Sequence, residues 1–151
     1  MSRPPPGARA DYRSFVPVTT RWMDNDVFGH VNNAVYYSLI DTAVTTLLVR
    51  WGILTWPGPH RAMVDRFMVV AEGGCRFHSE VAFPDPLTAG VRISRMGDRS
   101  ARIEVGIFRD NDPVAAAEGF LVHVCVDAAT RRPVPLPDDW RRILQPLVVE
   151  S

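Results

Sequence analysis

The sequence predicts an α+β protein in which a curved antiparallel sheet of about five strands wraps around one long central helix. Three observations support this. One stretch, residues 33–51, has the length and spacing of a helix and is apolar on most of its surface. One strand-like stretch precedes it, and four follow it. The 151 residues suffice for a single domain with one core, and no internal repeat is evident.

The N-terminal part supplies a tail, a first strand and a loop. Residues 1–13 are rich in proline and arginine, which predicts a flexible tail. Residues 15–22 have strand composition, and Pro17 favours an edge strand or a strand start. The loop 23–32 then leads directly into the helix.

The helix should be buried on most sides, because only Ser38, Asp41 and Thr45 form a thin polar stripe on it. Asn32 or Asn33 suits its N-cap, and Gly52 suits the position just beyond its C-cap.

The second half of the chain alternates between strands and turns. Gly73-Gly74 predicts a bulge in the long first strand. We expect a loop at 53–62, strands at 63–79, 87–96 and 101–109, a final strand ending near 127, and a short helix at 138–145. The single domain then covers 14–145, with a C-terminal tail at 146–151.

Composition excludes several classes of function. All 17 basic residues are arginine, which excludes lysine chemistry, and the net charge of zero gives no electrostatic case for nucleic acid or membrane binding. Cys75 and Cys125 lie in apolar strand patterns and are expected to be buried free thiols. The histidines show no close metal-binding pair, so no metal is expected. The chain has no signal-like or membrane-spanning apolar run, which predicts a cytoplasmic protein.

The most informative segment is Arg21–Tyr36, which places two acids, a glycine, a histidine and three asparagines at the start of the helix or directly before it. A carboxylate beside a helix N-terminus can attack a carbonyl or activate water, and free backbone N–H groups there can hold the oxyanion. The segment therefore predicts acyl-transfer chemistry with Asp26 as the acid. The alternative is that Asp26 only caps a turn.

The pattern Asp24-x-Asp26-x-x-Gly29-His30-Val31-Asn32-Asn33-x-x-Tyr36 resembles the signature of hotdog-fold acyl-CoA thioesterases of the 4-hydroxybenzoyl-CoA thioesterase type. The resemblance covers roughly 14–144 and includes 72–77, 83–88, 119–127 and 131–137. It implies a hotdog fold and hydrolysis of acyl-CoA, or a related acyl thioester, to free acid and thiol. It implies no cofactor, because CoA is part of the substrate. It also implies a homodimer or homotetramer with active sites where subunits meet.

The resemblance assigns catalytic roles to three positions. Asp26 would be the nucleophile or the general base, and both routes remain open. The backbone N–H of Asn33 would polarise the thioester carbonyl. His30 would orient Asp26 or contact substrate.

Three further positions are expected at the substrate. Gly29 would allow an unusual backbone conformation or a close approach, and Asn32 would bond the water, the loop or the helix start. Tyr36 would pack there rather than catalyse.

Other polar residues have weaker cases. Asp24 is expected to bond loop amides or Arg21. Asp41 is a rival nucleophile, but it lies about 12 Å from Asn33 along the helix, so a buried or interfacial hydrogen-bonding role is expected.

An apolar acyl pocket is expected from Phe67, Phe77 and Phe83. The arginines available for CoA phosphates are Arg76, Arg92, Arg95, Arg99 and Arg102.

Two other functions remain as alternatives: a hotdog hydratase or dehydratase, and a non-catalytic acyl-CoA-binding module. The sequence contains no phosphate-binding P-loop. It also contains no Gly-x-Ser-x-Gly elbow, which argues against a serine hydrolase.

Overall fold

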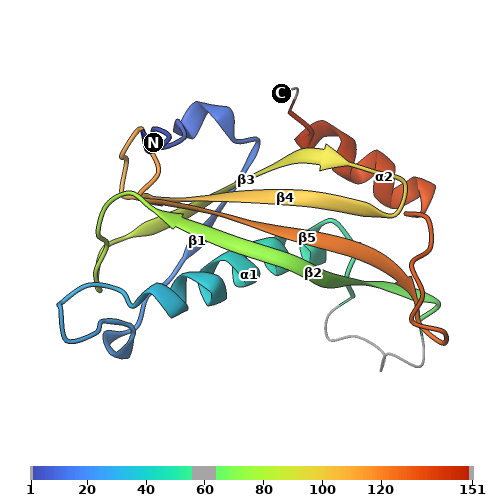
Figure 1. Ribbon diagram of the computed structural model, residues 1–151, viewed down its shortest axis with the longest axis horizontal. Helices are drawn as coiled ribbons and strands as arrows, with labels where there is room; N and C mark the ends of the chain where they lie inside the picture. Colours follow the sequence, from blue (N-terminus) through green and yellow to red (C-terminus); the bar gives the residue numbers. More distant parts are fainter. Residues whose placement is uncertain (1, 56–63, 150–151) are drawn as a thin grey trace.

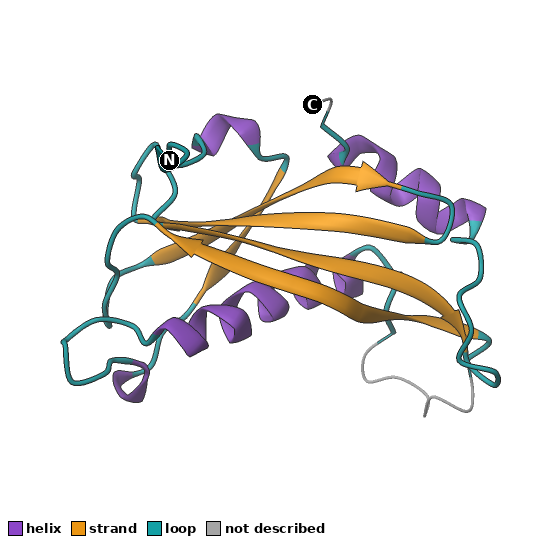
Figure 2. Ribbon diagram, viewed as in Figure 1, coloured by secondary structure: helices purple, strands orange, loops and turns teal. Residues whose placement is uncertain are grey.

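The computed structural model describes residues 2–55 and 64–149, and it confirms the predicted α+β architecture. One long helix lies under a five-stranded antiparallel sheet (Figure 1). Figure 2 distinguishes the helices and strands from the loops that connect them. The elements are β1 (Ser14–Val18), α1 (Asn33–Arg50), β2 (Arg66–Phe77), β3 (Leu87–Met96), β4 (Ser100–Arg109), β5 (Ala117–Asp127) and α2 (Asp138–Leu144).

The strands are arranged in the order β1-β3-β4-β5-β2, so β1 and β2 form the two edges of the described sheet. The strand that follows the helix, β2, pairs with the last strand, β5, over most of its length. This pairing brings the end of β2 next to the start of β5, although the two lie about forty residues apart in sequence. The twelve residues of β2 also leave one long strand edge without a partner in the described chain.

The core lies between α1 and one face of the sheet. Ile40, Ala43 and Val44 on the helix are almost completely buried against residues such as Val105 and Ile107. Each fully buried valine or isoleucine side chain of this kind contributes about 1.5–3 kcal/mol to folding. One stripe of α1 that includes Tyr37, Ser38, Asp41 and Thr42 remains exposed in the single chain, so the helix is less completely covered than its composition predicts.

The ends of α1 follow the local signals. Asn32 is the N-cap, with its side-chain oxygen accepting a hydrogen bond from the Ala34 amide at 2.9 Å. Trp51 is the C-cap, and Gly52 adopts φ +74°, the left-handed conformation that ends many helices.

The bulge in β2 does not lie where the paired glycines predict it. The register shifts between Val70 and Glu72, whereas Gly73 and Gly74 stay in regular pairing with Leu121 and Phe120. Gly74 serves packing instead, because a Cβ there would lie 2.7 Å from the Phe120 ring. The expected loop at 53–62 lies largely outside the described residues, as does Met63, the expected start of this strand.

Both expected tails contact the domain in their described parts. At the N-terminus, Tyr12 is buried, and Arg9 donates to the carbonyls of Asp110 and Asp112. At the other end, Leu147 is buried, and the Val149 amide donates to the Ile93 carbonyl. Residues 7–13 and 146–149 are thus packed segments of the domain rather than free tails.

Candidate functional site

The loop before α1 is held in shape by Asp24. Its buried carboxylate accepts hydrogen bonds from the Arg21 amide at 2.7 Å and from the Arg21 guanidinium at 2.8 Å and 3.1 Å. These bonds hold the pKa of Asp24 below its ordinary value. The Asp24 carbonyl also accepts from the Asn32 amide. The predicted pairing of Asp24 with Arg21 is confirmed, and the role of this acid is to shape the loop.

Asp26 lies at the centre of a tight turn. Its Oδ1 accepts a hydrogen bond from the Phe28 amide at 2.9 Å, and its Oδ2 lies 3.5 Å from the side-chain nitrogen of Asn32. Its backbone amide donates to the His30 carbonyl, and its carbonyl accepts from the Gly29 amide. The turn needs Gly29, whose φ of +85° disfavours any residue with a side chain. Asp26 thus makes the hydrogen bond of a capped turn, which is the alternative to a catalytic role. Only its Oδ1 is held at short distance, whereas Oδ2 makes only the 3.5 Å contact with Asn32 among the described residues.

The first amide of α1 is available for a ligand. The Ala34 amide is capped by the Asn32 side chain, and the Val35 amide donates to the Asn32 carbonyl. Within the described chain, no acceptor is paired with the Asn33 amide. An open N–H at a helix N-terminus, where the helix dipole is positive, is suited to an oxyanion.

A cleft of about 390 Å³ joins this loop to the end of β2. Asp26, His30, Asn33 and Tyr36 all line it, so four of the six predicted site residues meet in one place. Gly29 and Asn32 do not line it, and they act through the turn and the helix cap. The opposite wall consists of residues 77–80, Phe77, His78, Ser79 and Glu80.

Two of these predicted residues have well-defined packing. Tyr36 is buried, its ring meets Phe77 edge to face with centroids 5.0 Å apart, and burial raises the pKa of its hydroxyl. The His30 ring stacks on Phe28 and lies 3.8 Å from Glu80, and it makes no bond to Asp26. His30 supports Asp26 only through its backbone carbonyl.

Three residues of this wall, His78, Ser79 and Glu80, are not predicted from the sequence as site residues, whereas Phe77 is expected at an acyl pocket. From the sequence, His78 is considered only as a potential metal ligand, and Ser79 and Glu80 are not considered. No local sequence pattern marks these residues. They lie close to Asp26 because the Val31 amide donates to the Val81 carbonyl, which joins two distant parts of the chain. Only knowledge of that non-local contact would have found them.

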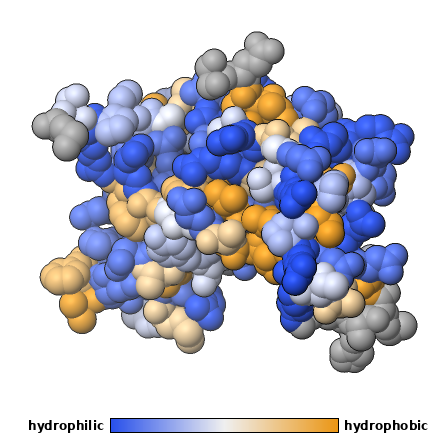
Figure 3. All heavy atoms as spheres, turned by 45° about the vertical axis from the view of Figure 1, so that its right-hand side comes forward, coloured by the Kyte–Doolittle hydropathy of each residue, from blue (hydrophilic) through white to orange (hydrophobic). Residues whose placement is uncertain are grey.

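The loop also exposes a large apolar surface. Trp22, Met23, Val27 and Phe28 are each at least 73% exposed. Orange surface is visible on the projecting lobe at the lower left of Figure 3, where Figure 1 places this loop. Such a cluster beside a polar cleft is typical of a surface that another molecule covers.

Asp41 lies in a different cavity, of about 930 Å³, formed by the second half of α1, the start of β2, β5 and α2. Its carboxylate is exposed in the single chain, so the expected burial is wrong there, and an interfacial role stays a prediction. His123 lines the same cavity. Burial lowers the pKa of His123, and Asp41 opposes that shift.

The residues expected to form one acyl pocket are dispersed. Phe77 lines the Asp26 cleft, Phe67 lines the Asp41 cavity, and Phe83 packs edge to face with Trp22. The single chain therefore contains no pocket that all three share among its described residues.

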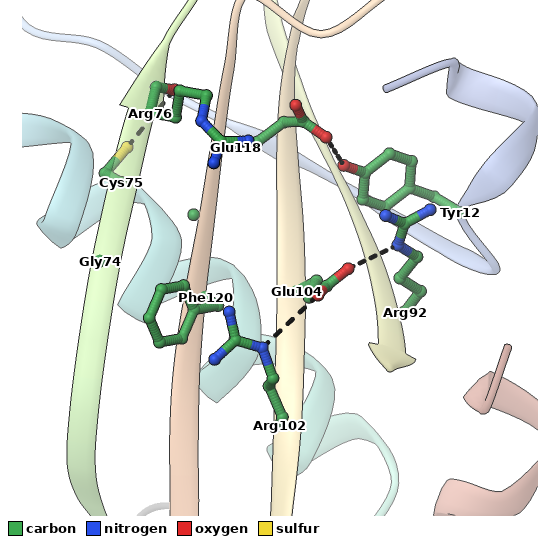
Figure 4. A pocket seen from close by; sticks show the side chains of 10 residues that line it. Tyr12, Gly74, Cys75, Arg76, Arg92, Arg102, Glu104, Glu118 and Phe120 are labelled. Atoms are coloured by element: carbon green, nitrogen blue, oxygen red, sulfur yellow. Dashed lines mark hydrogen bonds and ion pairs between the residues drawn. The ribbon is translucent and has the colours of Figure 1, made fainter. Parts of the chain in front are cut away.

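Several of the candidate phosphate-binding arginines lie on the face of the sheet opposite α1. Figure 4 shows Arg92 from β3 and Arg102 from β4 pointing toward Glu104 on β4, and the pairs lie 2.9 Å and 3.6 Å apart. Arg102 also covers the Phe120 ring, and Arg99 pairs with Asp98. Arg92, Arg99 and Arg102 are thus already paired with carboxylates. Arg76 and Arg95 are exposed and have no carboxylate partner within the described chain.

The remaining predictions concern thiols, metals and membranes. Both cysteines are free; Cys125 is buried and Cys75 only half-buried, and burial raises the pKa of Cys75 to about 11. Within residues 2–55 and 64–149, no three His, Cys, Asp or Glu side chains come together as a metal site. None of the helices in that part of the chain is long and apolar enough to cross a bilayer.

Comparison with known proteins places this geometry in context. Residues 18–144 match the model of the Thioesterase-like superfamily. The PA5185 protein of Pseudomonas aeruginosa strain PAO1 has a similar structure, with a TM-score of 0.86 and 38% identity over 95% of this chain and 97% of that one.

Two further relatives have names that state a function. A thioesterase from Thermus thermophilus, solved with coenzyme A and zinc, is 28% identical, with a TM-score of 0.72 over 91% of this chain and 95% of that one. The long-chain acyl-CoA thioesterase FadM of Escherichia coli is 23% identical over 123 residues, which cover 82% of this chain and 90% of FadM.

Proposed function

The chain belongs to the Thioesterase-like superfamily, has the hotdog fold and is a thioester hydrolase, and we propose that it cleaves acyl-CoA at the Asp26 cleft. The observation that carries this proposal is the meeting of an acid and an open helix amide in one cleft. Asp26 provides a carboxylate oxygen, and Asn33 provides an N–H that has no acceptor within the described chain. The names of the relatives from Thermus thermophilus and Escherichia coli support acyl-CoA as the substrate.

In the proposed reaction the thioester carbonyl binds at the start of α1. The Asn33 amide donates to the carbonyl oxygen and stabilises the negative charge that develops on it. Asp26 either attacks the carbonyl carbon or takes a proton from the attacking water. The Asn32 side chain, bonded to both Asp26 and the helix start, keeps the acid and the amide in a fixed relation.

The proposal includes self-association through β2. The free edge of this twelve-residue strand can pair with β2 of a second copy, which removes an exposed edge from both. Antiparallel pairing of two such strands places the Phe77 end of one beside the Phe67 end of the other. The Asp26 cleft of one subunit would then adjoin the Asp41 cavity of its partner.

A thiol-release assay on acyl-CoAs of different chain lengths tests the function. We expect free thiol and free acid in equal amounts from at least one member of the panel. Reversible addition of water to enoyl-CoA without thiol release would instead indicate a hydratase. Tight binding of every acyl-CoA without turnover would indicate a binding module.

A further inference from the structure

The carboxylate of Glu118 connects the outer face of the sheet to the wall of the Asp26 cleft. One of its oxygens lies 2.7 Å from Nε2 of His78, and the other accepts a hydrogen bond from the Tyr12 hydroxyl at 3.0 Å. Figure 4 shows Glu118 and Tyr12 pointing toward each other across the strands. The His78 and Glu118 side chains are only 7% and 18% exposed, so this pair is well shielded from water.

The hydrogen bond to Glu118 fixes the state of the His78 ring. A carboxylate accepts from an N–H, so the neutral ring carries its proton on Nε2 and a lone pair on Nδ1. The backbone adds to this rigidity, because the amides of His78 and Ser79 both donate to the Ala116 carbonyl, at 2.8 Å and 3.0 Å. A histidine held by a partly buried carboxylate in this way is oriented for proton transfer.

The other ring nitrogen is free to act. Nδ1 of His78 has no hydrogen-bond partner within the described chain, and it is not among the polar atoms sealed from solvent there. His78 lines the same cleft as Asp26. The cleft that His78 lines also holds the acid and the Asn33 amide. His30, Tyr36, Ser79 and Glu80 complete the polar lining of that cleft.

We propose that His78 is the base that deprotonates the hydrolytic water, and that Glu118 is a positioning residue that orients its ring. This inference rests on the proposed function, and it assigns Asp26 the role of nucleophile. The water would otherwise be activated by Asp26 itself, and His78 would have no part in the reaction.

The resulting reaction has two halves. In the first, an Asp26 oxygen bonds to the acyl carbon, the C–S bond breaks, and the thiolate leaves with the electron pair and takes a proton from solvent. In the second, Nδ1 of His78 takes one proton from water while the hydroxide oxygen bonds to the acyl carbonyl of the mixed anhydride. The C–O bond to Asp26 then breaks, the pair returns to the aspartate, and His78 releases its proton to solvent.

The test is His78→Gln in the full-length protein, assayed with the best acyl-CoA of the panel. We expect kcat to fall by about 10²-fold or more, as for loss of a general base. We also expect a rapid burst of about one thiol per active site, because the first half-reaction does not need His78. Hydroxylamine added after the burst should trap the acyl group as its hydroxamate.

Two companion positions separate catalysis from packing. His123→Gln makes the same chemical change in the other cavity and should give neither a burst nor a comparable fall in kcat. Glu118→Ala should give the burst with a smaller loss of kcat, because the ring is no longer oriented. Glu118→Gln should restore much of the rate, because its amide oxygen can still accept from Nε2–H.

The outcomes are decisive in either direction. A folded His78→Gln enzyme with parent kcat overturns the proposal, as does one that is slow but shows no burst. If His78→Gln does not fold, a Glu118→Ala enzyme without a burst overturns it equally. The proposed function is judged on the parent enzyme alone: a parent that releases no thiol refutes that function and this inference together, whereas an active parent leaves only His78 in question.

Discussion

The side chain of Asn32 joins the start of α1 to Asp26. Its Oδ1 accepts from the Ala34 amide at 2.9 Å, and its Nδ2 lies 3.5 Å from Oδ2 of Asp26. One residue thus serves two different purposes, a helix cap and a donor to the proposed catalytic acid. The two purposes use different atoms, so substitutions can separate them.

Asn32→Asp keeps the capping oxygen and loses the donor, whereas Asn32→Ala loses both. We expect Asn32→Ala to lower the free energy of unfolding by about 1 kcal/mol and Asn32→Asp to change it little. Both should lower kcat, because Asp26 loses its contact, and the aspartate adds a like charge beside it. Urea unfolding and thiol-release kinetics measure the two effects. Equal kcat in Asn32→Asp and the parent would show that this contact does not matter for turnover.

A second pair of substitutions distinguishes the two candidate acids. Asp26→Asn is nearly isosteric and should keep the fold while lowering kcat by about 100-fold or more. Asp41→Asn, in the other cavity, should mainly affect stability or assembly. Steady-state kinetics on both variants decide the assignment. The assignment of Asp26 is wrong if Asp41→Asn abolishes turnover while Asp26→Asn stays active.

Features that depend on residues close together in the sequence could be predicted, whereas features that depend on contacts between distant residues could not. Both ends of α1 could be predicted because Asn32 and Gly52 act on backbone a few residues away. Four of the six predicted site residues meet in the cleft for the same reason, since they lie in one continuous segment. Their catalytic roles stay predictions.

The contacts that could not be predicted depend on the register in which two strands pair. His78 meets Glu118 only because β2 pairs with β5 in one particular register, and a shift at Ala71 sets that register. A bulge moves side chains from one face of a sheet to the other, and the glycine pair pointed to the wrong position for it. The packing of Tyr12 on Glu118 was likewise hidden, because composition alone suggested a free tail.

Self-association should depend on the free edge of β2. Val70 on that strand and Val114 in the β4–β5 connection are exposed to similar degrees, 49% and 45%. We expect light scattering at micromolar concentration to give at least twice the monomer mass of 16.9 kDa. Val70→Glu should shift the mass toward the monomer, because a charge is introduced at the paired edge. Val114→Glu is the matched control and should not. A parent protein that is monomeric at this concentration would rule out the β2 interface.

Stability should decrease in mild acid because of His123. Burial holds the pKa of this ring below its ordinary value, so the ring stays neutral in the fold while the unfolded chain takes up a proton first. Stability is therefore lost as pH falls below about 6.5, by at most about 1.4 kcal/mol per pH unit for one proton. Urea unfolding from roughly pH 7.5 down to roughly pH 5 measures the slope. His123→Phe should flatten it, and an unchanged slope would assign the acid sensitivity to other groups.

The open amide of Asn33 allows a test of the oxyanion site that does not involve any acid. Asn33→Ala keeps the N–H and should keep much of the activity. Asn33→Pro removes the N–H at the first helical position, where proline is tolerated. Loss of one oxyanion donor typically lowers kcat by about 10²–10³-fold, so we expect a large fall in kcat with little change in substrate binding. Circular dichroism and oligomer mass must match the parent for the comparison to hold. A folded Asn33→Pro enzyme with near-parent kcat would remove this amide from the mechanism, and the His30 amide or the His30 ring would then be the next candidates, because the Gly29 amide already donates to the Asp26 carbonyl.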